Sequence, residues 1–311
     1  MIEERLGEDM CFIVGSPRSG TTVLAQLLGR HPEVAQLYEP YFLWEWHTGP
    51  GEDDRRVSSQ ADQRVKGFLR SEFDAYRRKA GASVLVEKTP VNSFRIPFIQ
   101  AVFPNARWIH LLRDGRDATV SIHREWQRRR DVVASRNPAR VLGLAASMLR
   151  RQPYWRNRLQ ALAYELRQRA VGPPAGWMNK AKWRDLPGWG PRFPGWYDAL
   201  GAVDDVIEFN AMQWRRCVEY VEAELPDSGV LEVRYEDLAS KPEATMETIQ
   251  DFLRVDRLPG IGRELVTGSI GQWSSRLTAD QQARVSRLLD DKLGDLGYTA
   301  DQAPPAREPA R

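Results

Sequence analysis

Short apolar runs separated by polar turns dominate the hydrophobic pattern of this 311-residue chain. Five of these runs have the length and apolar content of buried strands: 11–14, 33–37, 83–86, 107–112 and 230–234. Longer stretches with helical periodicity lie between them, so strands and helices alternate along the chain. This alternation predicts an α/β fold in which a parallel β-sheet is flanked by helices on both faces.

The predicted helices carry recognisable start signals. Ser240 with Glu243, and Thr278 with Gln281, have the spacing of capping boxes that open the last two long helices. Pro97 lies in the helical stretch 93–103, where it should either kink the helix or mark its first turn. Other helices are expected at 65–80, 141–149, 159–166 and 206–225.

The chain is expected to form a single domain over residues 1–300, followed by a Pro/Ala-rich, disordered tail at 301–311. A helical, Trp-rich insertion is expected at about 127–225, and its segment 172–198 is rich in Gly, Pro and Trp. Two interpretations of these tryptophans stay open. They either fill gaps in an irregular surface segment or form a lid that offers flat apolar area to an acceptor substrate.

Composition narrows the class of protein. The net charge of +3 is small for this length, so charge balance does not suggest a nucleic-acid partner. Two cysteines are too few for a disulfide framework or a metal site. No signal peptide is visible, and no apolar run approaches the roughly 18 residues of a membrane span. These features predict a cytoplasmic protein, and the arginine-rich composition favours a bacterial source.

Residues 11–28 combine a strand, a glycine-bounded loop and the start of a helix. The loop occupies 15–20, and Thr21 and Thr22 fall in the first helical turn. This geometry directs free backbone N–H groups at an anion, assisted by the helix dipole. The segment therefore predicts a phosphate site, in preference to a glycine-rich turn without a ligand.

This loop has the G-x-x-x-x-G frame of a P-loop, but Thr21 stands where the Walker lysine should be. The cation instead precedes the second glycine, at Arg18. The arrangement favours binding of a nucleotide phosphate without hydrolysis of a triphosphate. A P-loop kinase or NTPase is the alternative function, but the sequence lacks both the lysine and a strand-end acidic magnesium ligand.

Further polar side chains follow the other predicted strands. Glu39, Lys88 and Arg113 come at or just after strand ends, and Ser121 falls in the helix that follows Arg113. Loops of this kind gather at the carboxyl edge of an open parallel sheet. Together with Arg18, these residues predict an anion site beside a carboxylate, without a histidine or cysteine cluster for a metal.

Four motifs resemble the nucleotide-dependent sulfotransferases, and they occur in the order typical of that family: GSPRSGTT at 15–22, YEPYF at 38–42, EKTP at 87–90 and LLRDGRDATVS at 111–121. The resemblance covers 11–125 strongly and 230–277 weakly. It leans to the tyrosylprotein and heparan-type branches and their bacterial relatives. It implies that the donor is 3′-phosphoadenosine 5′-phosphosulfate (PAPS).

The resemblance also implies which residues bind the donor: Arg18, Ser19, Gly20, Thr21, Thr22, Arg113, Ser121, Tyr235, Ser269 and Arg276. Within this set, the loop backbone at 19–22 would hold the 5′-phosphate, and Arg113 with Ser121 would hold the 3′-phosphate. Ser269, Trp273 and Arg276 lie in one late segment, residues 269–277. This late segment would close over the nucleotide. Glu125 stands where an additional phosphate-binding arginine can occur, and Arg124 could replace that contact.

Three residues would carry the chemistry: Glu39 as general base, Lys88 facing the transferred group, and Arg18 beside the bridging oxygen. His123 is the best substitute base, whereas His110 is expected to be a packed core histidine. The acceptor would be a hydroxyl of a small molecule, sugar, lipid or peptide. A non-catalytic nucleotide-binding protein is a further alternative, but it would have no use for a base beside the phosphates.

Overall fold

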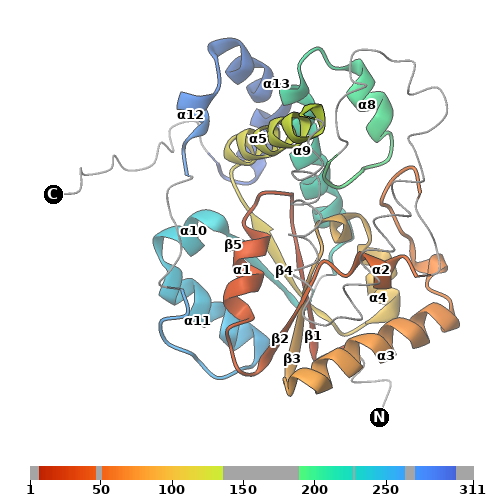
Figure 1. The fold of residues 1–311 in the computed structure, drawn as a ribbon. Coiled ribbons are helices and arrows are strands. Elements are labelled where there is room, and N and C mark those ends of the chain that lie inside the picture. Colours follow the sequence, from red (N-terminus) through yellow and green to blue (C-terminus); the bar gives the residue numbers. More distant parts are fainter. Residues whose placement is uncertain (1–6, 47–50, 136–188, 227, 263–269, 299–311) are drawn as a thin grey trace.

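The computed structural model describes residues 7–46, 51–135, 189–226, 228–262 and 270–298. Within them, five strands form one sheet in which every neighbouring pair is parallel: β1 (Met10–Val14), β2 (Val34–Tyr38), β3 (Val84–Lys88), β4 (Arg107–Leu112) and β5 (Val230–Arg234). The strand order is β2-β3-β1-β4-β5 (Figure 1). The predicted α/β fold with a parallel sheet is confirmed.

The strands differ from their predicted ranges by at most two residues at either end. The largest difference is at β3, which continues to Lys88, whereas the apolar run predicted an end at residue 86. Lys88 pairs with Tyr38 of β2 on one side and with Ile13 of β1 on the other. Pairing with two neighbours extends the strand through polar residues that, in sequence, are typical of a loop.

Side chains of each strand alternate between two covered faces. Phe12 packs on the face that is covered by α2 (Tyr41–Trp44), α3 (Gln63–Ala80) and α4 (Ile96–Val102). Ile13 packs on the opposite face, which is covered by α1 (Thr21–Leu28), α10 (Tyr235–Ser240) and α11 (Pro242–Leu253). Figure 1 shows the sheet between these two helical layers. Burial of both faces explains why the strands are continuous apolar runs.

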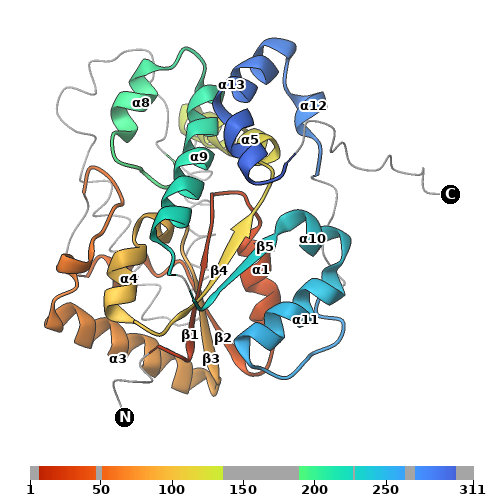
Figure 2. The same cartoon turned by 180° about the vertical axis from the view of Figure 1, so that it is seen from behind.

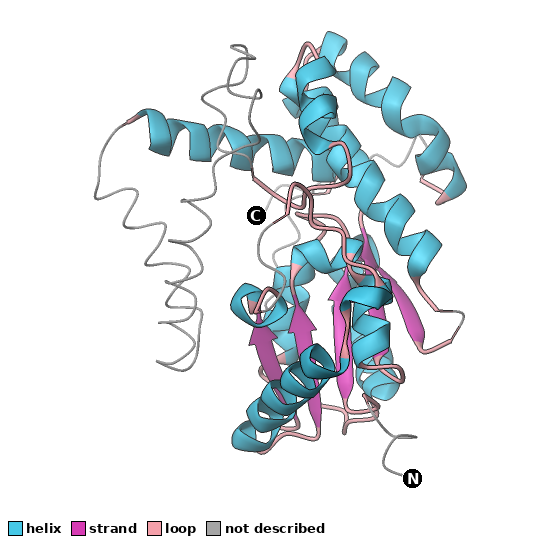
Figure 3. Ribbon diagram, turned by 90° about the vertical axis from the view of Figure 1, so that its right-hand side faces the viewer, coloured by secondary structure: helices cyan, strands magenta, loops and turns pink. Residues whose placement is uncertain are grey.

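A further group of helices lies beyond the carboxyl ends of the strands (Figures 2 and 3). Its members are α5 (Gly115–Ala134), α8 (Trp196–Ala202), α9 (Val206–Glu224), α12 (Trp273–Arg276) and α13 (Ala279–Asp295). Their shared core is aromatic: the Trp196 ring centroid lies 5.0 Å from that of Phe209 and 6.0 Å from that of Trp126. Trp196 of the Trp-rich segment is therefore a core residue, and Trp177 and Trp183 lie outside the described residues.

Helix starts follow the predicted signals in two of three cases. The Thr278 side chain accepts from the Gln281 N–H at 3.2 Å, so this capping box opens α13 as predicted. Pro97 lies in the first turn of α4, which follows the short η3 helix (Pro90–Phe94). The Ser240 prediction is wrong. Its hydroxyl donates to the Glu236 carbonyl within α10, and α11 begins instead at Pro242, a residue suited to a first turn.

Several predictions lie outside the described residues, namely the helices at 141–149 and 159–166 and the tail at 301–311. Between α2 and α3, the chain forms the short η2 helix (Ser58–Gln60). Among the helices that the structure describes, none combines the length and apolar character that a membrane crossing requires.

Gly15→Ala should destabilise the fold, because a Cβ on Gly15 would collide with the Leu111 carbonyl of β4. We expect a loss of about 1–3 kcal/mol in the free energy of unfolding, measured by urea denaturation. Gly67 inside α3 is the matched control. A Cβ there meets nothing within 4 Å, so Gly67→Ala should stabilise by about 0.5–1 kcal/mol. Equal effects of the two substitutions would contradict this interpretation.

Candidate active site

The loop between β1 and α1 forms a compact turn at the carboxyl edge of the sheet. The Ser19 N–H donates to the Ser16 carbonyl at 3.3 Å, and the two serine hydroxyls lie 2.5 Å apart. Arg18 and Gly20 both have left-handed backbone conformations, with φ of 68° and 95°. The helix α1 then begins at Thr21, as predicted. Its first N–H groups have no acceptor within the helix, so they are available to an anion.

A buried ion pair joins the ends of β2 and β3. Lys88 Nζ donates to Glu39 Oε1 at 2.7 Å, and the lysine side chain is only 3% exposed against 20% for Glu39. The Glu39 N–H also donates to the Lys88 carbonyl at 3.1 Å. Glu39 adopts a left-handed conformation with φ of 44°, which is strained for a residue with a side chain. The carboxylate is thus held beside the ammonium by both backbone and side chain.

Three side chains from distant segments meet beside the first loop. Arg113, directly after β4, donates from Nη1 to the Arg18 carbonyl at 3.0 Å. Arg18 in turn donates from Nε to Ser121 Oγ of α5, also at 3.0 Å. The Arg113 guanidinium stacks 4.5 Å from the centre of the Tyr235 ring, and a Cβ on Gly20 would come within 2.5 Å of that ring. Arginines and a hydroxyl are the donors that phosphate recognition requires.

The ring of Tyr38 lies beside the ion pair, with its centre 5.2 Å from Lys88 Nζ. The start of the loop is tied to the segment after Lys88 as well, because Ser93 Oγ of η3 accepts from the Gly15 N–H and donates to the Gly15 carbonyl, at 3.2 and 2.9 Å. Cations, a carboxylate and a helix amino terminus therefore share one edge of the sheet.

Asp117 of α5 holds the late segment at this edge of the sheet. The Asp117 carboxylate accepts from the backbone N–H groups of Gly271 and Trp273, at 2.5 and 3.0 Å. The guanidinium of Arg116 lies 4.5 Å from the centre of a ring of Trp273. Trp273 is the first residue of the short helix α12, although the sequence pattern of 268–273 is typical of a loop. Arg276 is exposed at the end of α12, and Ser269 lies outside the described residues.

Comparison with known proteins decides the family. A sequence model of the sulfotransferase family matches residues 11–173, just over half of the chain. The chain belongs to the sulfotransferase family. The matched range contains the first loop, the Glu39–Lys88 pair and the Arg113–Ser121 element, so the motifs that carried the resemblance lie within the family region.

Curated relatives match this chain over part of their length. The nodulation protein NoeE of Sinorhizobium fredii is 26% identical over 190 residues, which cover 56% of this chain and 43% of NoeE. A putative protein-tyrosine sulfotransferase of Caenorhabditis briggsae is 30% identical over 116 residues, covering 35% of this chain and 41% of that protein. The chain thus spans less than half the length of these two relatives.

Solved structures also resemble this chain. The sulfotransferase domain from the curacin biosynthetic pathway matches with a TM-score of 0.45 and 15% identity, over 93% of this chain and 97% of that domain. The mouse sulfotransferase SULT7A1 complexed with PAP matches with a TM-score of 0.42 and 16% identity, over 93% and 87% of the two chains.

The structure groups most of the predicted site residues, although their roles stay predictions. Arg18 was expected beside the bridging oxygen. In the structure its guanidinium contacts Ser121, one of the two residues predicted to bind the 3′-phosphate. Glu125 lies one turn after Ser121 in α5, and its carboxylate is paired with two arginines. Burial alone would raise its pKa, but hydrogen bonds from Arg128 and Arg129 lower the pKa of Glu125 to about 2. Arg124 is exposed.

Sequence reasoning missed Glu87, the residue before Lys88. Its side chain is 1% exposed, and its carboxyl accepts from Trp44 Nε1 at 3.1 Å, from Asn92 Nδ2 at 2.8 Å and from the Thr89 hydroxyl. Burial raises the pKa of Glu87 to about 7, although these hydrogen bonds and Lys88 oppose the rise. A charged residue inside a strand that is otherwise buried was the available signal.

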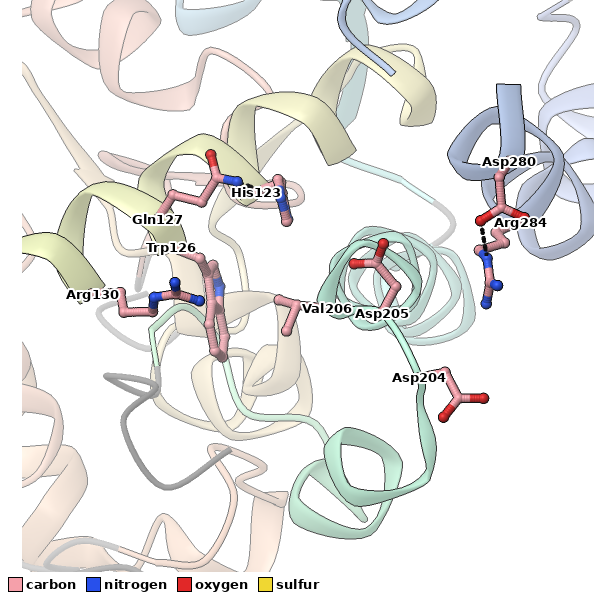
Figure 4. A pocket seen from close by; sticks show the side chains of 9 residues that line it. All are labelled: His123, Trp126, Gln127, Arg130, Asp204, Asp205, Val206, Asp280 and Arg284. Atoms are coloured by element: carbon pink, nitrogen blue, oxygen red, sulfur yellow. Dashed lines mark hydrogen bonds and ion pairs between the residues drawn. The ribbon is translucent and has the colours of Figure 1, made fainter. Parts of the chain in front are cut away.

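The histidines occupy other places. His110 is buried within β4, and burial lowers its pKa to about 4, as expected for a neutral core histidine. His123 has partners for both ring nitrogens, Asn210 at 3.0 Å and Gln127 at 2.9 Å. It lines a cavity of about 440 Å³ between α5, the start of α9 and α13 (Figure 4). None of the three predicted catalytic residues lines that cavity. The described residues hold no cluster of metal-binding side chains.

Glu87 makes stability depend on pH in a defined direction. Its pKa is raised from 4.5 to about 7 in the folded state. The contribution of Glu87 to the free energy of unfolding is therefore full below pH 4.5 and is lost as pH rises through 7. The stability of the wild type minus that of Glu87→Gln should therefore fall by about 3 kcal/mol between pH 4.5 and 7.5. Urea denaturation of both proteins at several pH values measures this difference. A flat difference would show that Glu87 titrates normally.

Proposed function

We propose that this sulfotransferase moves the sulfuryl group of PAPS to a hydroxyl of an acceptor, with Glu39 as the general base. One observation carries the proposal: Arg18, Arg113 and Ser121 converge beside the amino terminus of α1, on the same sheet edge as the Glu39–Lys88 pair. Phosphate-binding groups and a carboxylate are the two parts that such a transfer requires.

The residues at this edge suit a nucleotide with phosphates at two positions. The N–H groups at 19–22 would bind the 5′-phosphate at the start of α1, where the helix dipole favours negative charge. Arg113 and Ser121 would bind the 3′-phosphate. In the described structure both residues contact Arg18, through its carbonyl and its Nε. Phosphate oxygens can replace these contacts, because they accept from the N–H groups of Arg18 and Arg113 and from the Ser121 hydroxyl.

Two further segments would complete the donor site. Tyr235 already stacks against Arg113 and closes over Gly20, so its ring would lie near the nucleotide. The late segment is held at α5 by Asp117, and Ser269, Trp273 and Arg276 on this segment would approach the nucleotide from that side.

The transfer would proceed as an in-line displacement. The acceptor oxygen forms a bond to sulfur while the bond from sulfur to the bridging phosphate oxygen breaks. The acceptor proton passes to the Glu39 carboxylate, and 3′-phosphoadenosine 5′-phosphate (PAP) leaves with the bonding electron pair on its phosphate oxygen. Positioning and charge stabilisation dominate reactions of this type. Lys88 would stabilise the transferred group, and Arg18 the leaving oxygen, each by on the order of 3 kcal/mol.

The acceptor class stays broad: a hydroxyl of a small molecule, a sugar, a lipid or a peptide. Two relatives point in different directions by name, one being a nodulation protein and one a putative protein-tyrosine sulfotransferase. Incubation with radiolabelled PAPS and a panel of hydroxylated compounds would identify the acceptor.

Nucleotide discrimination tests the donor. PAP should raise the melting temperature far more than ATP with Mg²⁺ or AMP, because only PAP places a phosphate on Arg113 and Ser121. At 100 times its Kd, PAP should add about 2.7 kcal/mol of stability. Ser121→Ala should reduce the preference for PAP over AMP about tenfold or more, since it loses a hydrogen bond to a charged group. Stronger stabilisation by ATP with Mg²⁺ would instead indicate a kinase or NTPase.

Glu39→Gln tests the base. The amide keeps an oxygen for Lys88, so PAP affinity measured by calorimetry should stay within about twofold, whereas turnover of PAPS should fall at least about 100-fold. Glu33→Gln is the matched control, because Glu33 immediately precedes β2 and lies at its opposite end, where it accepts from the Asp256 N–H. Retained turnover in Glu39→Gln would remove this residue from the base role.

A further inference from the structure

A buried carboxyl links the two chain segments that carry Glu39 and Lys88. We propose that Glu87 is a positioning residue, which holds the Glu39–Lys88 pair in place through hydrogen bonds to Trp44 and to the turn that follows Lys88. The catalytic meaning of this role rests on the proposed function, whereas the geometric role can be measured without any turnover.

The first link runs through α2 to Glu39. Trp44, the last residue of α2, donates from Nε1 to Glu87 Oε1 at 3.1 Å. Its indole is wedged among aromatic rings, with centroid distances of 5.0 Å to Phe73 and 6.0 Å to Phe12. This helix begins two residues after Glu39, whose left-handed backbone conformation needs support from its surroundings. Anchoring the end of α2 to β3 supplies that support.

The second link runs through η3 to Lys88. The Thr89 hydroxyl donates to Oε1 of Glu87, and Asn92 Nδ2 donates to Oε2 at 2.8 Å. The two bonds fix the direction of the chain immediately after Lys88. Ser93 follows Asn92, and its hydroxyl accepts from the Gly15 N–H and donates to the Gly15 carbonyl. One carboxyl therefore orients the lysine segment, the segment of the base and the turn that supports the first loop.

The charges around Glu87 argue against a role as a counter-ion. Lys88, the next residue in β3, is paired with Glu39 at 2.7 Å, and Arg95, directly after η3, is paired with Glu45 at 2.9 Å. What the site requires is an acceptor for three buried donors. The two oxygens of the Glu87 side chain meet all three, Oε1 accepting from Trp44 and Thr89 and Oε2 from Asn92. An apolar residue would leave buried donors unsatisfied.

The reactivity of the Lys88 amine reports on this geometry directly. Lys88 is 3% exposed and ion-paired, so reductive methylation with formaldehyde should modify it far more slowly than the exposed Lys79, as measured by mass spectrometry of peptides. Trp44→Phe keeps an aromatic ring but removes the indole donor. We expect this variant to raise the rate ratio of Lys88 to Lys79 about five- to tenfold, the factor that corresponds to one lost hydrogen bond. Glu87→Ala loses three hydrogen bonds and should raise the ratio at least as much.

Rescue by the conservative variant separates positioning from general stability. In Glu87→Gln the amide oxygen can accept from Trp44 and Thr89. Asn92 can turn its own amide toward the new NH₂ group, because its Oδ1 is buried without a partner. The rate ratio should then stay within about twofold of the wild type. Gln250→Leu is the control for stability. Gln250 is a buried residue of α11, outside the candidate site, and its side-chain oxygen accepts from the Leu258 N–H.

Kinetics provide the second measurement, with radiolabelled PAPS and water as the probe acceptor. Trp44→Phe and Glu87→Ala should lower the rate of sulfate release at saturating PAPS at least fivefold, while the Kd for PAP changes less than about twofold. Glu87→Gln should retain most of the rate. If Glu87→Ala does not fold, Trp44→Phe carries the test alone.

Unchanged protection of Lys88 in folded Trp44→Phe would overturn the proposal, and so would an equal loss of protection in Gln250→Leu at similar stability. These outcomes are independent of the proposed function. A protein that neither binds PAP nor releases sulfate refutes the sulfotransferase assignment of the site, yet its Lys88 labelling still decides whether Glu87 positions the pair.

Discussion

The ion pair between Lys88 and Glu39 is the interaction on which the rest of the edge depends. A buried ammonium is tolerated only with a well-placed partner, and here the partner is supplied by strand register. Tyr38 pairs with Lys88, and the Glu39 N–H donates to the Lys88 carbonyl. A slip of one residue would turn the side chains to opposite faces and separate the charges. The parallel pairing of β2 with β3 is thus a chemical constraint as well as a structural one.

Close backbone packing sets the other half of the edge. Gly15 lies against the Leu111 carbonyl, and Gly20 lies against the ring of Tyr235. Both contacts need a residue without a side chain, so the first loop approaches β4 and α10 closely. This approach brings Arg18 within reach of Arg113 and Ser121. The cations converge because the glycines allow the loop to lie there, and the helix amino terminus adds its N–H groups at the same place.

A single helix, α5, connects these parts to the late segment. Asp117 holds the backbone of Gly271 and Trp273, and Ser121, one turn later, accepts from Arg18. Residues four apart lie on one face of a helix, so one face of α5 meets both the loop and the late segment. The aromatic core of α5, α8 and α9 fixes this helix above the sheet. Packing far from the edge thereby determines the arrangement of the polar groups.

Local signals along the chain were enough to predict the five strands, the start of α1 at Thr21 and the cap at Thr278, because apolar runs, glycines and capping residues act over a few neighbours. It failed where distant partners decide. Lys88 looked like a loop residue until two strands paired with it, and Ser240 looked like a cap although Pro242 starts the helix. Glu87 is the clearest case, since Trp44 donates to it from 43 residues away. The role of that carboxyl becomes visible only in the folded chain, because hydrogen bonds between distant segments leave no local pattern in the sequence.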